Sequence, residues 1–256
     1  MIGRLGKLLI SLVVTAMSPS IAVADPGKGL VSITFDDASR AQFDHGLRLA
    51  KAHGLVGTLF VPTGLIGDTP APDAWTMTWD EVRAFLAAGW EIGAHGQSHV
   101  RLPDLGPAEL LAEVSGSFSD ITAQIGVAPE SFSSPFGAIS DATLDRIMEQ
   151  YRFHLSWRGH GGRNPRTMFD PRQIGRLEVV NTMTAAEVCG EMVASARDGT
   201  WLVLLFHGIT ESAPGDYEVS ARMVDEIFSC AAFLDRRGLI KVATVRDAAR
   251  MIEAAQ

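Results

Sequence analysis

The chain has 256 residues, of which 46% are hydrophobic and 20% are charged, and its formal net charge is -8. The apolar content excludes an intrinsically disordered chain, and 25 Gly and 12 Pro without a fixed period exclude a collagen-like or low-complexity one. The acidic balance, with no cluster of Lys and Arg, argues against a nucleic-acid partner, because phosphate binding needs a dense basic patch. The length fits either two small domains or one α/β barrel.

Residues 1–24 have the pattern of a secretory signal peptide. Arg4 and Lys7 precede an apolar stretch over residues 8–17, and an Ala-Val-Ala triplet at 22–24 offers a cleavage site. The apolar stretch is shorter than the roughly 20 residues that span a bilayer, which disfavours the alternative of an uncleaved membrane anchor. No later stretch approaches spanning length. We therefore expect an exported protein, periplasmic or extracellular, with no transmembrane segment after cleavage.

The remaining chain alternates short apolar runs with amphipathic stretches. The runs typical of strands cover residues 30–35, 58–61, 90–94, 131–134, 152–157, 174–179, 201–206 and 240–243. The stretches with helical spacing cover residues 41–53, 78–88, 107–124, 142–150, 185–197, 219–236 and 245–254. Residues 158–171 lack an apolar period and are predicted to form a long loop. Strands that alternate with helices predict an α/β fold with a parallel sheet, either doubly wound or closed into a barrel.

Unusual polar residues follow several of the predicted strands. Asp36 and Asp37 follow the first, His95 and His99 follow the third, and His207 follows the strongly apolar run over 201–206. In a parallel α/β fold, residues just beyond the carboxyl ends of the strands meet at one end of the sheet. Either acid alone could be a turn or capping residue, but such a fold gives no structural reason for all five together.

One carboxylate and two imidazoles form a plausible set of metal ligands. His95 and His99 are four residues apart and can share one ion, which also relieves the repulsion between Asp36 and Asp37. The other carboxylate then stays free as a general base. Gly96 stands where a zinc-protease motif has Glu, which disfavours that interpretation. A non-haem iron oxygenase uses the same ligand types, but its ligands ordinarily come from an all-β fold.

With these residues the chain resembles the polysaccharide deacetylases, a carbohydrate esterase family with a NodB-like domain that removes N- or O-acetyl groups from glycans. The resemblance covers roughly residues 29–252. Its strongest motifs are Thr34-Phe35-Asp36-Asp37, His95 to His99, Pro135-Phe136-Gly137 and Leu205-Phe206-His207. Residues 57–61, 77–79 and 242–245 match in addition. The resemblance implies that residues 25–256 form one catalytic domain, a deformed (β/α) barrel of about seven parallel strands.

The resemblance also implies a role for each motif residue. The general base would be Asp36, the general acid His207, and the metal ligands Asp37, His95 and His99. The expected ion is zinc, with cobalt, nickel and manganese as alternatives. The substrate contacts would come from Pro135, Phe136, Trp157 and Leu205, with the backbone N–H of Phe136 at the oxyanion.

Three features of the sequence depart from the family pattern. Ser133 stands where the third motif usually has an Arg that orients the catalytic Asp, and Arg176 is our first candidate to replace it, before Arg158 and Arg166. Gly96 stands where Ser or Thr is common. The Asp-rich fourth motif is missing, which leaves Trp157 as an expected wall of the sugar groove.

We therefore expect a secreted, metal-dependent hydrolase that removes acetyl groups from an N-acetylated, or alternatively O-acetylated, polysaccharide or oligosaccharide. The alternatives are a hydrolase of a non-sugar amide on the same fold, and a glycan-binding domain that has lost activity. Asp36 and His207, which binding alone would not require, weigh against the latter. The sequence leaves open the glycan, the oligomeric state, and whether Cys189 and Cys230, in two predicted helices, form a disulfide.

Overall fold

The computed structural model describes residues 29–69, 74–156, 161–212 and 214–256. The predicted signal peptide therefore lies outside the described residues, as do Trp157 and Arg158. Within these ranges, none of the helices combines the length and the apolar character that crossing a membrane requires.

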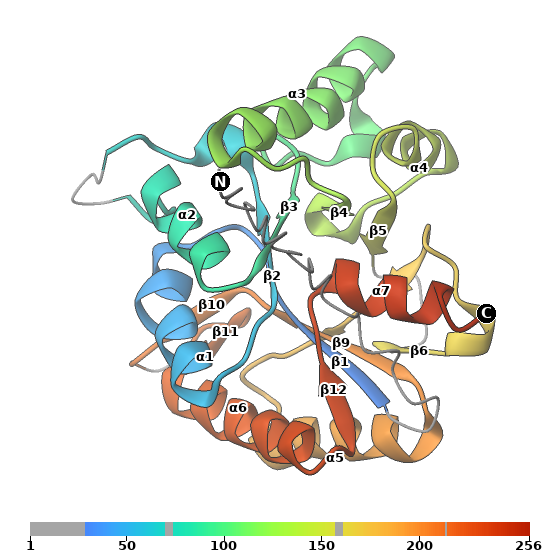
Figure 1. Ribbon diagram of the computed structural model, residues 1–256. Coiled ribbons are helices and arrows are strands. Elements are labelled where there is room, and N and C mark those ends of the chain that lie inside the picture. Colours follow the sequence, from blue (N-terminus) through green and yellow to red (C-terminus); the bar gives the residue numbers. More distant parts are fainter. Residues whose placement is uncertain (1–28, 70–73, 157–160, 213) are drawn as a thin grey trace, which may run out of the picture.

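A nearly closed ring of parallel strands forms the centre of the molecule (Figure 1). The ring contains β1 (Gly29–Phe35), β2 (Thr58–Val61), β3 (Glu91–Ala94), β4 (Ser131–Ser133), β5 (Phe153–Ser156), β7 (Ile174–Gly175), β8 (Leu177–Glu178) and β9 (Trp201–Phe206). Neighbouring strands pair in chain order from β1 to β5, and β9 pairs with β1. β7 pairs with β5 while β8 pairs with β9, so this one segment joins the two ends of the sheet. The predicted deformed (β/α) barrel is confirmed.

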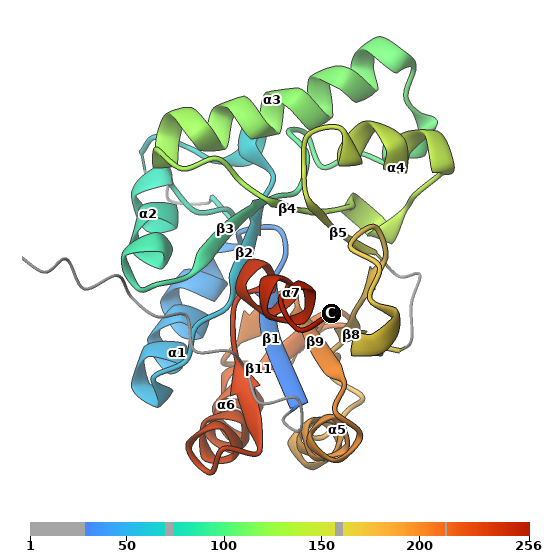
Figure 2. The ribbon, with the colours of Figure 1, turned by 45° about the vertical axis from the view of Figure 1, so that its right-hand side comes forward.

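Most of the helices lie around the outside of this ring, and the last one lies across its end (Figures 1 and 2). They are α1 (Arg48–His53), α2 (Trp79–Ala87), α3 (Pro107–Ile125), α4 (Asp141–Met148), α5 (Ala185–Asp198), α6 (Ala221–Arg236) and α7 (Val245–Glu253). α2 and α5 each begin with a threonine N-cap, which forms a capping box with the glutamate three residues later. A large apolar cluster fills the space between the strands and the helices.

The last helix covers the amino ends of the strands. α7 follows β12 (Ile240–Val242), which pairs with the first half of β1. The backbone N–H of Val245 donates to Oγ1 of Thr58, the first residue of β2, and the N–H of Arg246 donates to Oε2 of Glu91, the first residue of β3. Apolar side chains of α7 pack with residues of the strands in a second buried cluster. The carboxyl ends of the strands remain free to form a site.

The segment predicted as one strand over residues 174–179 is divided at Arg176. The reason is a side chain of β6 (Arg163–Asn164), which lies inside the predicted loop and pairs antiparallel with β9. Oδ1 of Asn164 accepts a hydrogen bond from the N–H of Gly175 at 2.8 Å, and Nδ2 of Asn164 donates to the Gly175 carbonyl at 2.9 Å. The side-chain amide thus makes the hydrogen bonds that the backbone of a neighbouring strand would make. The long loop expected over residues 158–171 is therefore partly ordered as a strand.

Two predicted helices also differ at their amino ends. The helix expected over residues 41–53 begins with a π-helical segment, Gln42–Leu47, before α1. The helix expected from residue 219 begins two residues later, because β11 (Glu218–Ser220) pairs with β10 (Gly208–Thr210). Both irregular segments lie close to the strand exits, where the chain leaves regular geometry.

The two cysteines connect neighbouring helices on the outer face. Cys189 of α5 and Cys230 of α6 form a disulfide with their Cα atoms 6.0 Å apart. The question that the sequence leaves open is thus answered by the packing of these two helices against each other.

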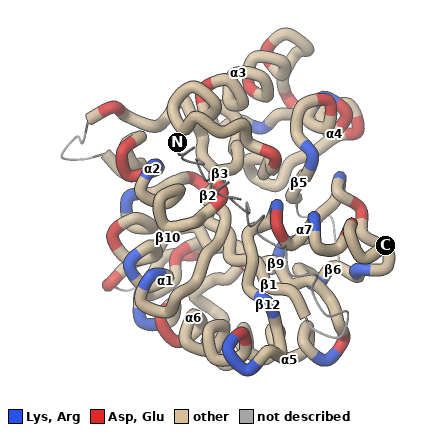
Figure 3. Tube along the Cα trace, in the orientation of Figure 1, with Lys and Arg blue, Asp and Glu red and all other residues tan. Residues whose placement is uncertain are grey.

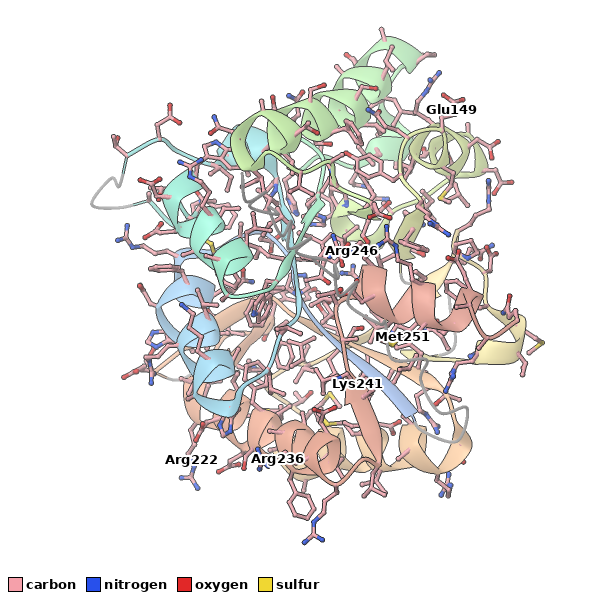
Figure 4. The ribbon with its side chains drawn as sticks, in the orientation of Figure 1. Glu149, Arg222, Arg236, Lys241, Arg246 and Met251 are labelled. Atoms are coloured by element: carbon pink, nitrogen blue, oxygen red, sulfur yellow. A yellow bond between two sulfur atoms is a disulfide. The ribbon has the colours of Figure 1, made fainter. Side chains whose placement is uncertain are left out.

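Positive and negative residues are interspersed along the outer helices (Figure 3). The side chains of Arg222 and Arg236 extend outward from α6 (Figure 4), and Arg222 pairs with Glu226 one turn later at 3.0 Å. Exposed pairs of this kind contribute little to stability. Arg222 and Glu226 thus balance each other's charge on the surface of α6.

Candidate active site

A cavity of about 610 Å³ lies at the carboxyl ends of the strands. The residues that line it come from segments distant in sequence, and they are Asp36, Asp37, His95, His99, Phe136, Gly137, Arg176, Glu178, Leu205, His207 and Tyr217. All five acidic and histidine residues expected at the strand exits therefore meet in one place.

Asp37, His95 and His99 place three ligand atoms within 4.8 Å of one another. Oδ1 of Asp37 lies 3.3 Å from Nε2 of His95 and 3.1 Å from Nε2 of His99. Nδ1 of His95 bonds the Ser133 carbonyl at 2.7 Å and must donate to it, which leaves a lone pair on Nε2. Oδ1 of Asp37 is buried and makes no hydrogen bond within the described part of the chain. A divalent cation would satisfy all three atoms, so these residues fit the expected metal.

The electrostatic surroundings keep Asp37 ionised. Burial raises the pKa of the Asp37 carboxyl, but the imidazoles of His95 and His99 beside it lower that pKa well below its usual range. A carboxylate that is already deprotonated is the form that binds a metal.

Several residues around the cavity have left-handed backbone conformations. The φ angles of Asp37, His99 and Phe136 are 75°, 54° and 59°. Residues other than glycine rarely adopt this region, and the surrounding structure must hold them there. Such conformations are typical of functional sites, and here they occur in three of the four motifs that resemble the family.

Asp36 is buried against a guanidinium and a hydroxyl. Nη1 of Arg176 donates to both carboxylate oxygens of Asp36 at 2.8 Å, and Oγ of Ser133 donates to Oδ2 at 2.9 Å. Burial raises the pKa of Asp36, but Arg176 and then His95 lower it, and the net direction is down. Asp36 is therefore an ionised carboxylate at neutral pH, able to accept a proton.

The structure thus places Arg176 beside Asp36, where the family motif would have brought an Arg from position 133. The other two candidates lie elsewhere or are undescribed. Arg166 belongs to a short 3-10 turn, Arg166–Met168, and Arg158 lies outside the described residues.

His207 lies next to an acid that our sequence analysis did not identify. Nδ1 of His207 is 3.1 Å from Oε1 of Glu178, close enough for an ion pair although the two atoms are not aligned for a hydrogen bond. Burial lowers the pKa of His207, but Glu178 raises it, and the net direction is up. One signal in the sequence pointed to Glu178: it is two residues after Arg176 in a predicted strand, which puts both on one face.

Gln42 is a second residue that sequence reasoning missed. Its side chain is fully buried, and Nε2 donates to the carbonyl oxygens of Asp36 at 2.6 Å and His207 at 2.7 Å. Oε1 accepts the N–H of Ser39 at 3.1 Å. Gln42 therefore ties the exit of β1 to the exit of β9. A glutamine at the start of a predicted helix carries no signal of this role.

Two of the four predicted substrate contacts, Phe136 and Leu205, line the cavity. Phe136 is 55% exposed, and its ring centroid lies 4.7 Å from that of His99. Leu205 lines the cavity and is buried, and Pro135 is buried without lining it. Trp157 lies outside the described residues. Tyr217, which was not predicted, is exposed at the mouth of the cavity.

Solved structures of several carbohydrate-active enzymes share this fold. A peptidoglycan deacetylase, PdaC, from Bacillus subtilis is 20% identical, with a TM-score of 0.57 over 91% of this chain and 95% of that chain. A family 4 carbohydrate esterase from Streptomyces lividans, in complex with acetate, is 19% identical, with a TM-score of 0.55 over 84% and 91%. The Xyl-CE4 domain of a multidomain xylanase from the hindgut metagenome of Trinervitermes trinervoides is 17% identical, with a TM-score of 0.56 over 89% and 91%.

The sequence profile described as polysaccharide deacetylase matches residues 24–154, just over half of the chain. No curated protein is significantly similar to the chain in sequence. The profile covers the strands that carry Asp36, Asp37, His95 and His99. The chain therefore belongs to the polysaccharide deacetylase family and is a hydrolase.

Proposed function

We propose that this chain is an exported, divalent-metal-dependent deacetylase that releases acetate from an N-acetylated polysaccharide or oligosaccharide, with O-acetylated glycans as a further substrate class. The observation that carries the proposal is the cavity in which Asp37, His95 and His99 converge beside the ionised Asp36 and His207, whose pKa is raised by Glu178. Export rests on the signal-peptide pattern of residues 1–24.

Asp37, His95 and His99 would hold the ion. Two imidazoles and one carboxylate suit zinc, with cobalt, nickel and manganese as alternatives, and three protein ligands leave room for water and substrate. When bound, the ion would supply positive charge to polarise the acetyl carbonyl.

The side chains of this chain would move the protons. Water adds to the acetyl carbonyl carbon, and Asp36 accepts the proton that the water loses. Arg176 and Ser133 hold the Asp36 carboxylate in place through the hydrogen bonds described above. The carbon–nitrogen bond then breaks, and His207 donates a proton to the departing sugar amine. Acetate and a free amine are the products, and Glu178 favours the protonated form of His207 that this step requires.

The walls of the cavity are consistent with an acetylated sugar. Leu205 offers a small apolar surface for the acetyl methyl group, and the exposed ring of Phe136 offers a flat face beside His99. The backbone N–H of Phe136 is our candidate donor to the oxyanion. The panel of glycans to be tested contains peptidoglycan and acetylated xylan, because the structural relatives include a peptidoglycan deacetylase and a domain of a xylanase. It also contains chitooligosaccharides and poly-N-acetylglucosamine.

The test is acetate release from that panel by the mature protein, with and without a chelator. We expect release from at least one glycan, loss of release after chelation, and recovery when zinc is added. Asp36→Asn should lower kcat at least about 100-fold, whereas Asp80→Asn, an exposed acid of α2, should leave it unchanged. A protein that binds no divalent ion, or an Asp36→Asn variant with full activity, would contradict the proposal. Acetate released only from non-sugar amides would favour the alternative hydrolase.

A further inference from the structure

We propose that α3 positions the metal ligands, through Glu113 and Asp120, by holding the loop that connects His95 to His99. This inference rests on the metal site of the proposed function. It concerns residues that touch neither the ion nor the substrate, so Glu113 and Asp120 are positioning residues.

Glu113 receives two backbone donors from the middle of that loop. Its Oε2 accepts the N–H of Gln97 at 2.7 Å and the N–H of Ser98 at 2.9 Å. Glu113 is only 8% exposed, although glutamate is rarely buried unless it is paired. Hydrogen bonds to a carboxylate are shorter and stronger than neutral ones. One buried carboxylate therefore determines the path of the backbone between the two histidines.

Asp120, two turns further along α3, holds the same loop by a side chain. Its Oδ2 accepts Nε2 of Gln97 at 2.8 Å and Oγ1 of Thr63 at 2.7 Å. The turn after β2 holds the loop from another side, since the N–H of Thr63 donates to the Gly96 carbonyl and the N–H of Gly64 donates to the Gln97 carbonyl. Gln97 is thus fixed at its N–H, its carbonyl and its amide.

The spacing along α3 matches this role. Glu113, Gly116 and Asp120 are separated by three and four residues, which places them on one face of the helix. A Cβ at Gly116 would lie 2.3 Å from Cδ of Gln97, so a glycine is what lets the Gln97 side chain cross the helix surface. The three positions form one contact surface for the loop.

The same contact explains a departure from the family pattern. Gly96 has a φ angle of 72°, and a Cβ at this position would lie 2.9 Å from Oε2 of Glu113. A Ser or Thr at position 96 would therefore be strained and would crowd the carboxylate. In this chain, Glu113 of α3 supports the loop, and the absence of a side chain at Gly96 leaves room for the Glu113 carboxylate.

Loss of these contacts should lower the affinity for the metal ion more than the stability of the fold. His99 is in a left-handed conformation with a φ angle of 54°, and the loop on its amino-terminal side has the contacts with Glu113 and Asp120 described above. Residues that orient metal ligands typically change metal affinity by about 10- to 100-fold when they are replaced. We expect a loss of that size for zinc in Glu113→Ala, and a smaller one in Glu113→Gln, whose amide oxygen remains an acceptor.

The experiment measures zinc affinity by competition with a chromogenic chelator, with circular dichroism as the check of folding. The control for Glu113→Ala is Glu109→Ala, because Glu109 is one turn earlier on α3 and also accepts a backbone N–H, that of Gly106. The second pair is Gly116→Ala and Gly190→Ala, two helix glycines of which Gly190 has open space where its Cβ would be. We expect weaker zinc binding in Glu113→Ala and Gly116→Ala, and unchanged binding in both controls.

The outcomes separate this inference from the proposed function. Wild-type protein that binds none of zinc, cobalt, nickel and manganese would overturn the metal site itself. Zinc binding of wild-type strength in folded Gly116→Ala, and in Glu113→Ala where it folds, would overturn only the role of α3. Equal weakening in Glu113→Ala and Glu109→Ala would also overturn it, because the effect would then come from the helix and not from its contact with the loop.

Discussion

Nη1 of Arg176 donates to both carboxylate oxygens of Asp36, across a separation of 140 residues in the sequence. The contact is made where β7 ends and β8 begins, at the point where the ring of strands is completed. The residue that lowers the pKa of the candidate base therefore lies between the two strands that bring the ends of the sheet together. Ser133, which stands where an Arg is usual in the family, adds a hydrogen bond of its own.

Arg176→Met should destabilise the protein strongly. It leaves the buried Asp36 carboxylate without its cation, and breaking a buried pair from one side typically costs about 3–5 kcal/mol. The measurement is the free energy of unfolding in urea. The double variant Asp36→Asn/Arg176→Met should lose less than Arg176→Met alone, because no uncompensated charge stays buried. If the stability losses of Asp36→Asn and Arg176→Met add up to that of the double variant, the two side chains are not coupled in this way.

Gln42→Met should impair catalysis more than substrate binding. The substitution keeps the length of the side chain but removes the donor to the carbonyl groups of Asp36 and His207. Each buried acceptor left unpaired costs about 1–3 kcal/mol. A small displacement between base and acid should lower kcat about 10- to 100-fold with little change in KM. Steady-state kinetics on the best glycan check this, with the exposed Gln173→Met as the control; a change confined to KM would contradict it.

His154 should make the fold less stable in acid. Burial lowers the pKa of His154 to about 4 from 6.5, and its ring bonds the Ser134 hydroxyl and the Arg172 carbonyl. Between these two pH values the unfolded chain binds a proton that the folded protein does not, so the free energy of unfolding falls as the pH is lowered through this range. The full difference is about 3 kcal/mol.

Urea unfolding at pH 7, 5.5 and 4.5 measures this effect, and His154→Gln should show a flatter decline than the wild type. An NMR titration of the His154 ring checks the cause directly. A ring that titrates near 6.5 in the folded protein would exclude it as the source of acid sensitivity.

Removal of the disulfide should lower stability without changing the site. The bridge joins residues 41 apart, and closing a loop of that length stabilises the folded state by about 4 kcal/mol in the chain-entropy model. We expect Cys189→Ser/Cys230→Ser to unfold at correspondingly lower urea concentration and to be insensitive to dithiothreitol. Wild-type protein in dithiothreitol should approach the same midpoint, and zinc affinity should be unchanged in all samples.

The sequence by itself determined the local features of this protein. The periodicity of apolar residues located the main strands and helices, because an element that buries one face has apolar residues at regular spacing along the chain. Asp36, Asp37, His95 and His99 were identified because each lies at a strand exit, and in a parallel α/β fold those exits share one end. All four residues lie within the range 24–154 that the family profile matches.

Only the tertiary structure decided which distant residues serve that site. Arg176 had been one of three candidates, and Glu178, Gln42 and Glu113 had not been candidates at all. Each acts through a contact whose partner is far along the chain or on another element, such as the 165 residues between Gln42 and His207. Hydrophobic periodicity carries no information about such pairs, because they form only when the ring of strands closes and brings the exits of β1, β3, β8 and β9 together.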